Sequence, residues 1–449
     1  MATDRYALRS DENYPKPLYR ILTTLTLILI LAWSSFGLLG LLHPKHISAE
    51  EQQIRKYAYN DVNYRLLPNT IFFKLPSKQA IDTNGTLNED NSFRQLLSRA
   101  DSILSEEASS VMRKKQTPFS VDKHDFVSLS PYFWPNLTKS TGLPYIYRDS
   151  ETNPEVDTIP DARSMHEMAK KVRILSVAYY LTDNASYASK ASELLRIWFL
   201  DNETRMNPNL EHSEVKPGIN NGSHSGIMSG IYLLDVPDAV ELIHDSGAWS
   251  KQDQNGIELW FSRYLDWLLN SDFGMEERKS LNNHGTWYDV QVSSIALFLN
   301  KPEITREVIK NYTDKLIAAK IRPDGLQPNE VHRRVSFDYH LFNLQAFFNL
   351  AKIGYHIGID LWNDTTPEGS GLQKELDYLL RYALGKEKWP YEQIRPVDKA
   401  KLLPVLCQAI SHYEEDERYK QAYRSIDGPK VSAIDSIING CITEPVDNK

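Results

Sequence analysis

The chain has 449 residues, a formal net charge of −8 and hydrophobic residues at 41% of its positions. This length suits one large domain or two ordinary ones, and the composition is that of a mostly globular protein. The negative net charge argues against general nucleic-acid binding, and we expect no nucleic-acid partner. An anionic ligand would need a local cluster of basic residues, because the overall field opposes its approach.

The first long apolar segment covers residues 21–42 and carries no charged side chain. Because about 20 apolar residues span a bilayer, we expect a retained transmembrane anchor rather than a cleaved or buried segment. Four basic residues precede the segment, whereas Lys45 is the first one to follow it. The positive-inside rule therefore predicts a single-pass type II membrane protein, with residues 1–20 as a cytoplasmic tail and the large domain extracellular or luminal.

The sequons and cysteines agree with an extracellular or luminal position of the large domain. N-x-S/T sequons begin at Asn84, Asn136, Asn184, Asn202, Asn221, Asn311 and Asn363. As a set they suit a secretory glycoprotein. Cys407 and Cys441 are the only cysteines, and they either form one disulfide or remain two buried thiols.

Apolar residues at helical spacing dominate the chain after a polar stem at residues 43–90. We expect one domain at 91–425 and a C-terminal tail at 426–449. The helices are predicted at 92–113, 163–181, 185–199, 227–244, 253–269, 289–299, 304–320, 339–357, 372–384, 399–413 and 417–425. Successive helical hairpins predict an all-α fold, an incomplete (α/α) toroid preceded by one N-terminal transmembrane helix. The long loops at 121–162, 204–225, 279–288 and 323–336 are expected to gather at one mouth of the toroid.

Two motifs carry the residue types of an elimination site: N-N-H-G-T-W-Y at 282–288 and E-V-H-R-R-V-S-F-D-Y at 330–339. Elimination in a uronate polymer removes the C5 proton beside a carboxylate. The site must therefore neutralise the carboxylate, place a base at C5 and supply an acid to the bridging oxygen.

Individual side chains fit these tasks. Asn283 can donate its amide hydrogens to the carboxylate, and Arg333 offers a charged bidentate fork. His284 can act as a base or donor near neutral pH, and Tyr339 can exchange a proton if neighbouring positive charge lowers its pKa. Gly285 permits close backbone approach. Taken singly, each of these residues also suits a plain structural role in a loop, a solvated surface or a helical core.

Together these motifs resemble the alginate lyase superfamily of α/α-toroid polysaccharide lyases. Supporting stretches are F-V-S-L-S-P-Y-F-W-P at 126–135, G-L-P-Y-I-Y-R-D at 142–149, M-N-P-N-L at 206–210, P-G-I-N-N-G at 217–222 and W-P-Y-E-Q-I at 389–394. The similarity runs from about residue 90 to about residue 425. It implies a lyase that cleaves alginate, glucuronan or a similar polymer without a metal or other cofactor.

The resemblance implies that Asn283, His284, Arg333 and Tyr339 form the catalytic site. Asn283 and Arg333 would neutralise the carboxylate, and Tyr339 would be the acid. Tyr339 would also be the base when the proton and the leaving oxygen share one face, as in mannuronate. His284 is the better candidate base for guluronate or glucuronate, where they lie on opposite faces.

Candidate sugar-binding residues are aromatic or basic: Tyr132, Trp134, Tyr145, Arg148 and Trp389. Packing of these loops against the toroid is the alternative interpretation. The chain departs from the family pattern where His332 and Arg334 flank Arg333, and around Ser223 to Ser225, which leaves the substrate open. A glycan on Asn221 in that second loop would obstruct a cleft.

Two other functions remain open on the residues alone. A glycoside hydrolase needs a pair of carboxylic acids, and Asp125, Asp149, Glu155, Asp289, Glu330 and Asp338 are available. A membrane-anchored protein that binds acidic polysaccharide without catalysis is the second alternative. No metal-binding, phosphate-binding or nucleophile-elbow motif is present in the sequence.

Overall fold

A computed structural model describes residues 64–66, 70–76, 91–310, 312, 316–414, 416–426 and 432–440. The predicted tail at 1–20 and the predicted anchor at 21–42 lie outside these residues. Among the described residues, no helix is both long enough and apolar enough to cross a bilayer. The compact unit that contains all of them begins at Ala58.

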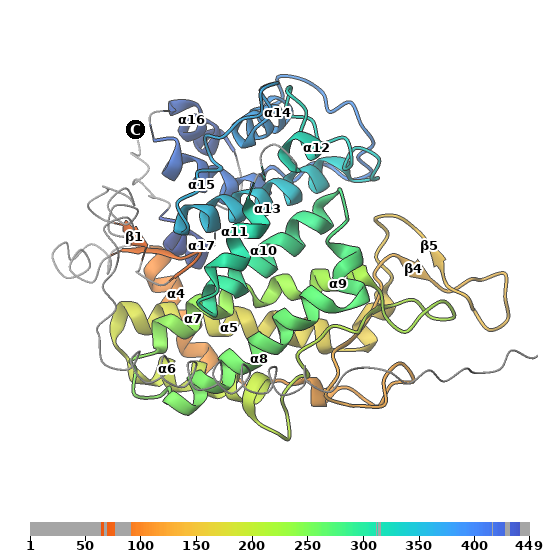
Figure 1. Cartoon of the computed structure of the whole chain (residues 1–449), viewed down its shortest axis with the longest axis vertical. Helices are drawn as coiled ribbons and strands as arrows, with labels where there is room; N and C mark the ends of the chain where they lie inside the picture. Colours follow the sequence, from red (N-terminus) through yellow and green to blue (C-terminus); the bar gives the residue numbers. More distant parts are fainter. Residues whose placement is uncertain are drawn as a thin grey trace, which may run out of the picture. The chain divides into compact units, whose positions relative to one another are not determined.

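The predicted helical character is confirmed (Figure 1). The α-helices are α4 (Asn91–Leu104), α5 (Asp161–Thr182), α6 (Ala185–Leu195), α7 (Asp235–Ile243), α8 (Lys251–Asn270), α9 (Asp272–Glu277), α10 (Asn283–Phe298), α11 (Pro302–Ile309), α12 (Ala318–Lys320), α13 (Ser336–His356), α14 (Leu372–Ala383), α15 (Leu403–His412), α16 (Glu417–Ser425) and α17 (Ala433–Ile438). Shorter helical turns are η2 (Val111–Arg113), η3 (Pro154–Thr158), η4 (Arg196–Leu200), η5 (His224–Leu233) and η7 (Lys399–Leu402).

Neighbouring helices pack in pairs around one apolar core. Helix α5 packs against α4, α6 and α7, while α10 packs against α8, α11 and α13. Helix α13 continues the series to α14 and α15, and α17 packs against α4. Helix α10 is buried continuously from Gly285 to Ala296, which is the burial expected of a helix enclosed by others.

Local chemistry explains where the α5–α6 hairpin turns. Asp183 adopts a left-handed conformation with φ of 55° and ends α5. The side chain of Asn184 then accepts a hydrogen bond from the backbone N–H of Ser186 and caps α6. The break predicted at these two residues is confirmed.

Helix α10 begins earlier than the sequence predicts, and this changes the setting of the first motif. The loop expected at 279–288 ends at Asn282, whose side chain accepts a hydrogen bond from the backbone N–H of His284 and caps the helix. Asn283 and His284 therefore stand in the first helical turn rather than in a loop. A Cβ on Gly285 would lie 2.0 Å from the carbonyl oxygen of Ser280, so the close backbone approach expected at this glycine is present.

Other helix boundaries also differ from the predictions. The helix expected at 92–113 ends at Leu104, and the one expected at 227–244 is a 3-10 segment, η5, followed by α7. The one expected at 304–320 is interrupted after Ile309. Helix α17 lies within the stretch assigned to the C-terminal tail.

Short strands occur in the connecting segments. Strands β1 (Tyr64–Leu66) and β2 (Lys74–Pro76) pair antiparallel, as do β4 (Phe133–Trp134) and β5 (Ile146–Tyr147). Strand β3 (Val127–Leu129) pairs in parallel with β6 (His212–Val215). Figure 1 shows the β4–β5 hairpin extending from the helical body.

Among the described sequon asparagines, Asn184, Asn202, Asn221 and Asn363 are exposed, while Asn136 is half-buried. Glycosylation at these positions stays a prediction. Cys407 is disulfide-bonded, and Cys441 lies outside the described residues.

Candidate active site

A buried carboxylate holds the asparagine at the start of α10. Glu330 accepts hydrogen bonds from the backbone N–H of Asn283 at 2.5 Å and from its side-chain Nδ2 at 2.9 Å. Asn283 is only 1% exposed, and Glu330 is equally buried. The orientation of the Asn283 amide is therefore fixed, with one of its two side-chain hydrogens already used by Glu330.

A second buried carboxylate orients the neighbouring histidine. His284 Nδ1 lies 2.7 Å from one oxygen of Glu277, and His224 Nδ1 lies 2.7 Å from the other. Glu277 is fully buried, while the His284 side chain keeps 21% of its surface exposed. A carboxylate on Nδ1 fixes the ring and leaves Nε2 available for chemistry.

Glu277 and the histidines that contact it, His224 and His284, affect the pKa values of this site. Burial lowers the pKa of His284, but its hydrogen bond to Glu277 and the nearby negative charge outweigh burial and raise the pKa above its usual value. Burial raises the pKa of Glu277, and the two histidines outweigh it and lower that pKa. Glu214 and Glu330 add to the negative charge that His284 senses.

The second motif forms a contact cluster of its own. Arg333 Nη2 donates a hydrogen bond of 2.5 Å to the hydroxyl of Tyr339, and the guanidinium carbon lies 3.7 Å from the centre of that ring. The Tyr339 hydroxyl also lies 2.9 Å from the hydroxyl of Tyr132. The predicted arginine and tyrosine therefore meet directly, and Tyr132 joins them from a distant part of the chain.

Asp149 holds the arginine pair. One of its oxygens accepts hydrogen bonds from Arg333 Nε at 2.9 Å and Nη2 at 2.6 Å, and the other accepts the backbone N–H of Arg334 at 2.9 Å. The Arg334 side chain donates to the backbone carbonyl of Asp149 and contacts the carboxylates of Glu151 and Glu392. Arg333 is thus the arginine that reaches Tyr339, and its charge already has a counter-ion.

The pKa of Tyr339 differs from the sequence expectation. Arg333 lowers it, but burial and the neighbouring Tyr132 outweigh that effect and raise the pKa above its usual value. The phenol is therefore protonated at neutral pH. The residue is set up to donate a proton, and it can accept one only after its surroundings change.

Glu330 connects the two motifs. Its side chain bonds Asn283, and its backbone carbonyl accepts the N–H of Arg333 at 3.3 Å. Both His284 and Arg333 lower the pKa of Glu330 through their charges, although burial outweighs them and raises it. Asn283 thus bonds this carboxylate directly, His284 and Arg333 act on it through their charges, and Tyr339 is joined to the group through Arg333.

The predicted sugar-binding residues fall into two groups. Trp134 on β4 stacks against Arg148, whose guanidinium carbon lies 4.9 Å from the ring centre. Tyr145 donates a hydrogen bond of 2.6 Å to Glu155. These three residues belong to the β4–β5 hairpin region, which also supplies Tyr132 and therefore borders the Arg333–Tyr339 cluster.

Trp389 lies apart from that hairpin. Its indole Nε1 donates a hydrogen bond of 2.8 Å to Ser336, and its ring packs against Phe337, His340 and Tyr382. Trp389 therefore packs its loop against the helical body, which is the alternative interpretation of this residue. Its role in sugar binding stays a prediction.

The sequence indicated the candidate catalytic residues but not the side chains that hold them in place. Glu277 and His224 are scattered in sequence and carry no motif. Asp149 and Glu330 were considered only as acids for a hydrolase. The one available signal was the glutamate three residues before Arg333. Among the described residues, no cluster of histidine, cysteine, aspartate or glutamate could hold a metal ion.

The family comparison decides the class of the protein. A family model for alginate lyase matches residues 110–389. The chain belongs to the alginate lyase family. It is therefore a polysaccharide lyase, as its sequence motifs indicate. A comparison with curated proteins gives no significant match.

One solved structure supports this assignment. An alginate lyase from Bacteroides ovatus is 30% identical, with a TM-score of 0.76, over 83% of this chain and 99% of that chain. Alginate lyase A1-III from Sphingomonas species A1 is 11% identical, with a TM-score of 0.43, over 77% of this chain and 94% of that chain. The helical body thus has the α/α-toroid fold of the Bacteroides alginate lyase.

Proposed function

We propose that the enzyme cleaves a uronate-containing acidic polysaccharide, alginate or a glucuronan-like polymer, by metal-independent β-elimination. The observation that carries this proposal is the contact of Arg333 with the hydroxyl of Tyr339, beside an Asn283–His284 pair held by buried carboxylates. This arrangement supplies a carboxylate-binding fork, a proton donor and an imidazole base within one group of residues.

The first task is to make the C5 proton removable. Arg333 and the remaining amide hydrogen of Asn283 would bind the uronate carboxylate and stabilise the negative charge that develops as the proton leaves. Because Asp149 already binds Arg333, the substrate must share or displace that contact. Asn283 adds a directed hydrogen bond whose geometry Glu330 fixes in advance.

The second task is proton transfer. The base takes the C5 proton, the electron pair forms the C4–C5 double bond, and the C4–O bond breaks as Tyr339 protonates the departing oxygen. The raised pKa keeps Tyr339 protonated, which suits the acid role rather than the base role, and His284, whose Nε2 is left free by the bond of Nδ1 to Glu277, is the candidate base. That division suits guluronate or glucuronate. Mannuronate is the second candidate, because Tyr339 would there act as both base and acid, and the hydroxyl of Tyr132 contacts the Tyr339 hydroxyl and could relay its proton.

The hydrolase alternative has less support. Each carboxylate suggested for it accepts a hydrogen bond from another side chain of the protein: Asp125, Asp149, Glu155, Asp289, Glu330 and Asp338. Two of them, Asp149 and Glu330, instead position the arginine and the asparagine of the proposed lyase site.

Tyr339→Phe tests the proposal. We expect it to lower kcat by at least about 100-fold, because it removes the proton donor while keeping the ring. The assay is the ultraviolet absorbance of the C4–C5 double bond, measured over polyguluronate, polymannuronate and glucuronan. Tyr179→Phe on α5 makes the same chemical change away from the site and should retain activity. Failure of the folded parent protein to form an unsaturated product from any uronate polymer would reject the proposal.

We also infer that the domain acts outside the cytosol, anchored by residues 21–42. The disulfide at Cys407 supports an oxidising compartment. Protease added to sealed, right-side-out plasma-membrane vesicles should digest an extracellular domain, and sealed organelle vesicles with the cytosolic face outward should protect a luminal one. Digestion of the domain in the second preparation, together with protection in the first, would contradict the inference.

A further inference from the structure

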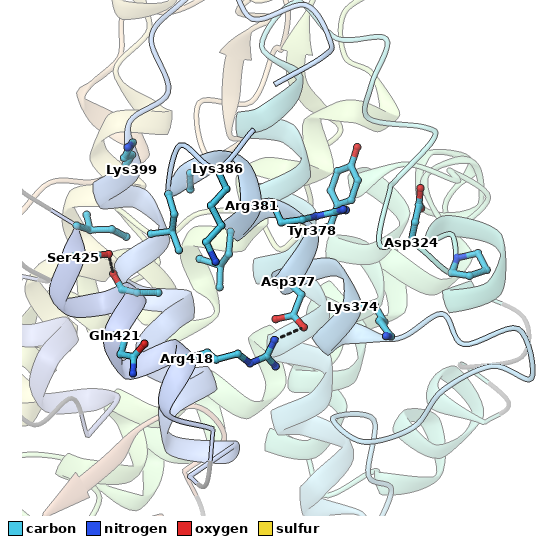
Figure 2. A pocket seen from close by; sticks show the side chains of 16 residues that line it. Asp324, Lys374, Asp377, Tyr378, Arg381, Lys386, Lys399, Arg418, Gln421 and Ser425 are labelled. Carbon is cyan, nitrogen blue, oxygen red and sulfur yellow. Dashed lines mark hydrogen bonds and ion pairs between the residues drawn. The ribbon is translucent and has the colours of Figure 1, made fainter. Parts of the chain in front are cut away.

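A large hollow lies between α14 and α16, outside the candidate active site. Its volume is about 760 Å³, which is within the size range of ligand sites. Figure 2 shows Arg381, Asp377 and Lys374 of α14 facing Arg418 and Gln421 of α16 across this space. None of the four proposed catalytic residues lines it.

Positive charge dominates the lining. Five cations, Lys374, Arg381, Lys386, Lys399 and Arg418, face two acids, Asp324 and Asp377. Arg418 is neutralised by Asp377 at 3.1 Å and by Asp416 at 2.6 Å. The side chains of the three lysines are exposed and form no ion pair with any described residue. In a chain of net charge −8, such a concentration of unpaired cations favours an anionic ligand.

The arrangement of these lysines suits a polymer more than a single small anion. Lys374 belongs to α14, Lys386 follows that helix, and Lys399 begins η7. Charges presented by separate elements around an open space match carboxylates that repeat along a flexible chain. Gln421 and Ser425 add neutral hydrogen-bonding groups of the kind that bind sugar hydroxyls.

A chain of ring contacts links the hollow to the second catalytic motif. The Arg381 guanidinium lies 5.8 Å from the centre of the Tyr382 ring, and that ring lies 5.0 Å from Trp389. Trp389 bonds Ser336, the first residue of α13 and three residues before Tyr339. These contacts connect the lining of the hollow to the first turn of α13, the helix that carries Tyr339.

We propose that this hollow is an accessory binding site for a carboxylated polysaccharide, in which Lys374, Lys386 and Lys399 bind a stretch of the polymer other than the one being cleaved. The assignment rests on the proposed function for the identity of the polymer. It predicts that the site contributes to the binding of long chains and contributes little to the binding of short ones.

The test combines Lys374→Gln, Lys386→Gln and Lys399→Gln in one triple variant of the full chain. A matched triple variant, Lys170→Gln, Lys251→Gln and Lys310→Gln, removes the same charge from exposed positions outside the hollow. Binding is measured by affinity electrophoresis in gels that contain alginate, dextran or a single-stranded oligonucleotide. Tyr339→Phe is added to all three proteins so that the alginate is not consumed.

We expect the hollow variant to bind alginate at least fivefold more weakly than the matched variant, with no binding of dextran by either. Equal alginate binding by the two variants would overturn the proposal. It would also be overturned if the oligonucleotide bound the parent as tightly as alginate and lost affinity in the hollow variant, because the site would then be a general polyanion site.

Kinetics separate this proposal from the proposed function. With Tyr339 intact, the hollow variant should show a raised KM on long alginate and an unchanged KM on a tetrasaccharide. If no polymer is cleaved but alginate binding still depends on the three lysines, the lyase proposal fails and the accessory site stands. If cleavage occurs and KM is unchanged on both substrates, the accessory site fails and the lyase proposal stands.

Discussion

Glu277 is a carboxylate enclosed between two imidazoles, and it controls the protonation of the proposed base. It raises the pKa of His284 against the opposing effect of burial. Replacing it in Glu277→Gln removes the largest of the effects that oppose burial, so the pKa of His284 should fall. Because the base must be neutral, we expect the acidic limb of the kcat/KM profile to move to lower pH. The measurement is the pH dependence of kcat/KM, obtained from the absorbance of the unsaturated product that forms from the best uronate polymer.

The stability of this variant should also depend on pH. The raised pKa of His284 stabilises the fold fully below its ordinary value of 6.5, and that contribution is lost as the pH rises through the folded pKa. The lowered pKa of Glu277 contributes above its ordinary value of 4.5 and is lost as the pH falls through the folded pKa. The loss of stability in Glu277→Gln should therefore be largest between these two values.

Glu276→Gln is the matched control. Glu276 is 62% exposed and contacts only the outer nitrogen of His224, at 3.3 Å. It should leave the acidic limb in place. An acidic limb that does not move in Glu277→Gln would mean that His284 is not the base that sets it.

At the same scale, the sequence predicted the candidate catalytic residues but not what holds them. Asn283, His284, Arg333 and Tyr339 stand in two short motifs with recognisable chemistry. Asp149 binds Arg333 from 184 residues away, and Glu330, which opens the second motif, binds Asn283 from 47 residues away. The sequence shows these carboxylates but not which side chains they bind, because tertiary packing determines the partner.

The start of α10 is the element on which the site depends. Glu330→Gln would keep an acceptor for the backbone N–H of Asn283 but would place an amide donor against the Asn283 side chain. We expect the loss of this charge-assisted bond to cost about 1–3 kcal/mol of stability and to lower kcat/KM by about tenfold or more. Thermal unfolding and steady-state kinetics measure the two effects.

A double-mutant cycle with Asn283→Ala tests whether Glu330 acts through the asparagine. If it does, the double variant should be about as slow as Asn283→Ala alone. Fully additive losses would show that Glu330 contributes by another route, such as its charge near Arg333.

Helix interiors were predictable, whereas several ends were not. Periodic apolar residues indicated α5, α8, α13 and α14 to within a few residues. The start of α10 was missed because asparagine, histidine and glycine favour loops over helices. Its first turn is instead stabilised by the Asn282 cap and by Glu330, a contact the sequence does not display.

On the scale of the whole molecule, one buried aspartate ties the segment before α4 to the core. Asp238 on α7 accepts the backbone N–H groups of Ile71, Phe72 and Phe73 at 2.6, 2.7 and 2.9 Å. Asp238→Asn offers only one acceptor to three buried donors. We expect the free energy of unfolding to fall by about 2 kcal/mol or more, measured by urea unfolding.

Asp245→Asn is a suitable control, because the Asp245 side chain is 99% exposed. It should change the unfolding free energy by less than about 0.5 kcal/mol. A similarly small change in Asp238→Asn would show that the segment at 70–76 is held by its apolar side chains rather than by this carboxylate.

The pairing of Arg333 with Asp149 bears on how easily the enzyme releases what it makes. A second carboxylate binds less tightly to an arginine that already has a counter-ion than to an arginine without one. Under the proposed mechanism, substrate and unsaturated product both present that carboxylate to Arg333, so both would be held weakly in the ground state. Asp149 would then return to Arg333 as the product leaves, which would reset the site for another uronate unit.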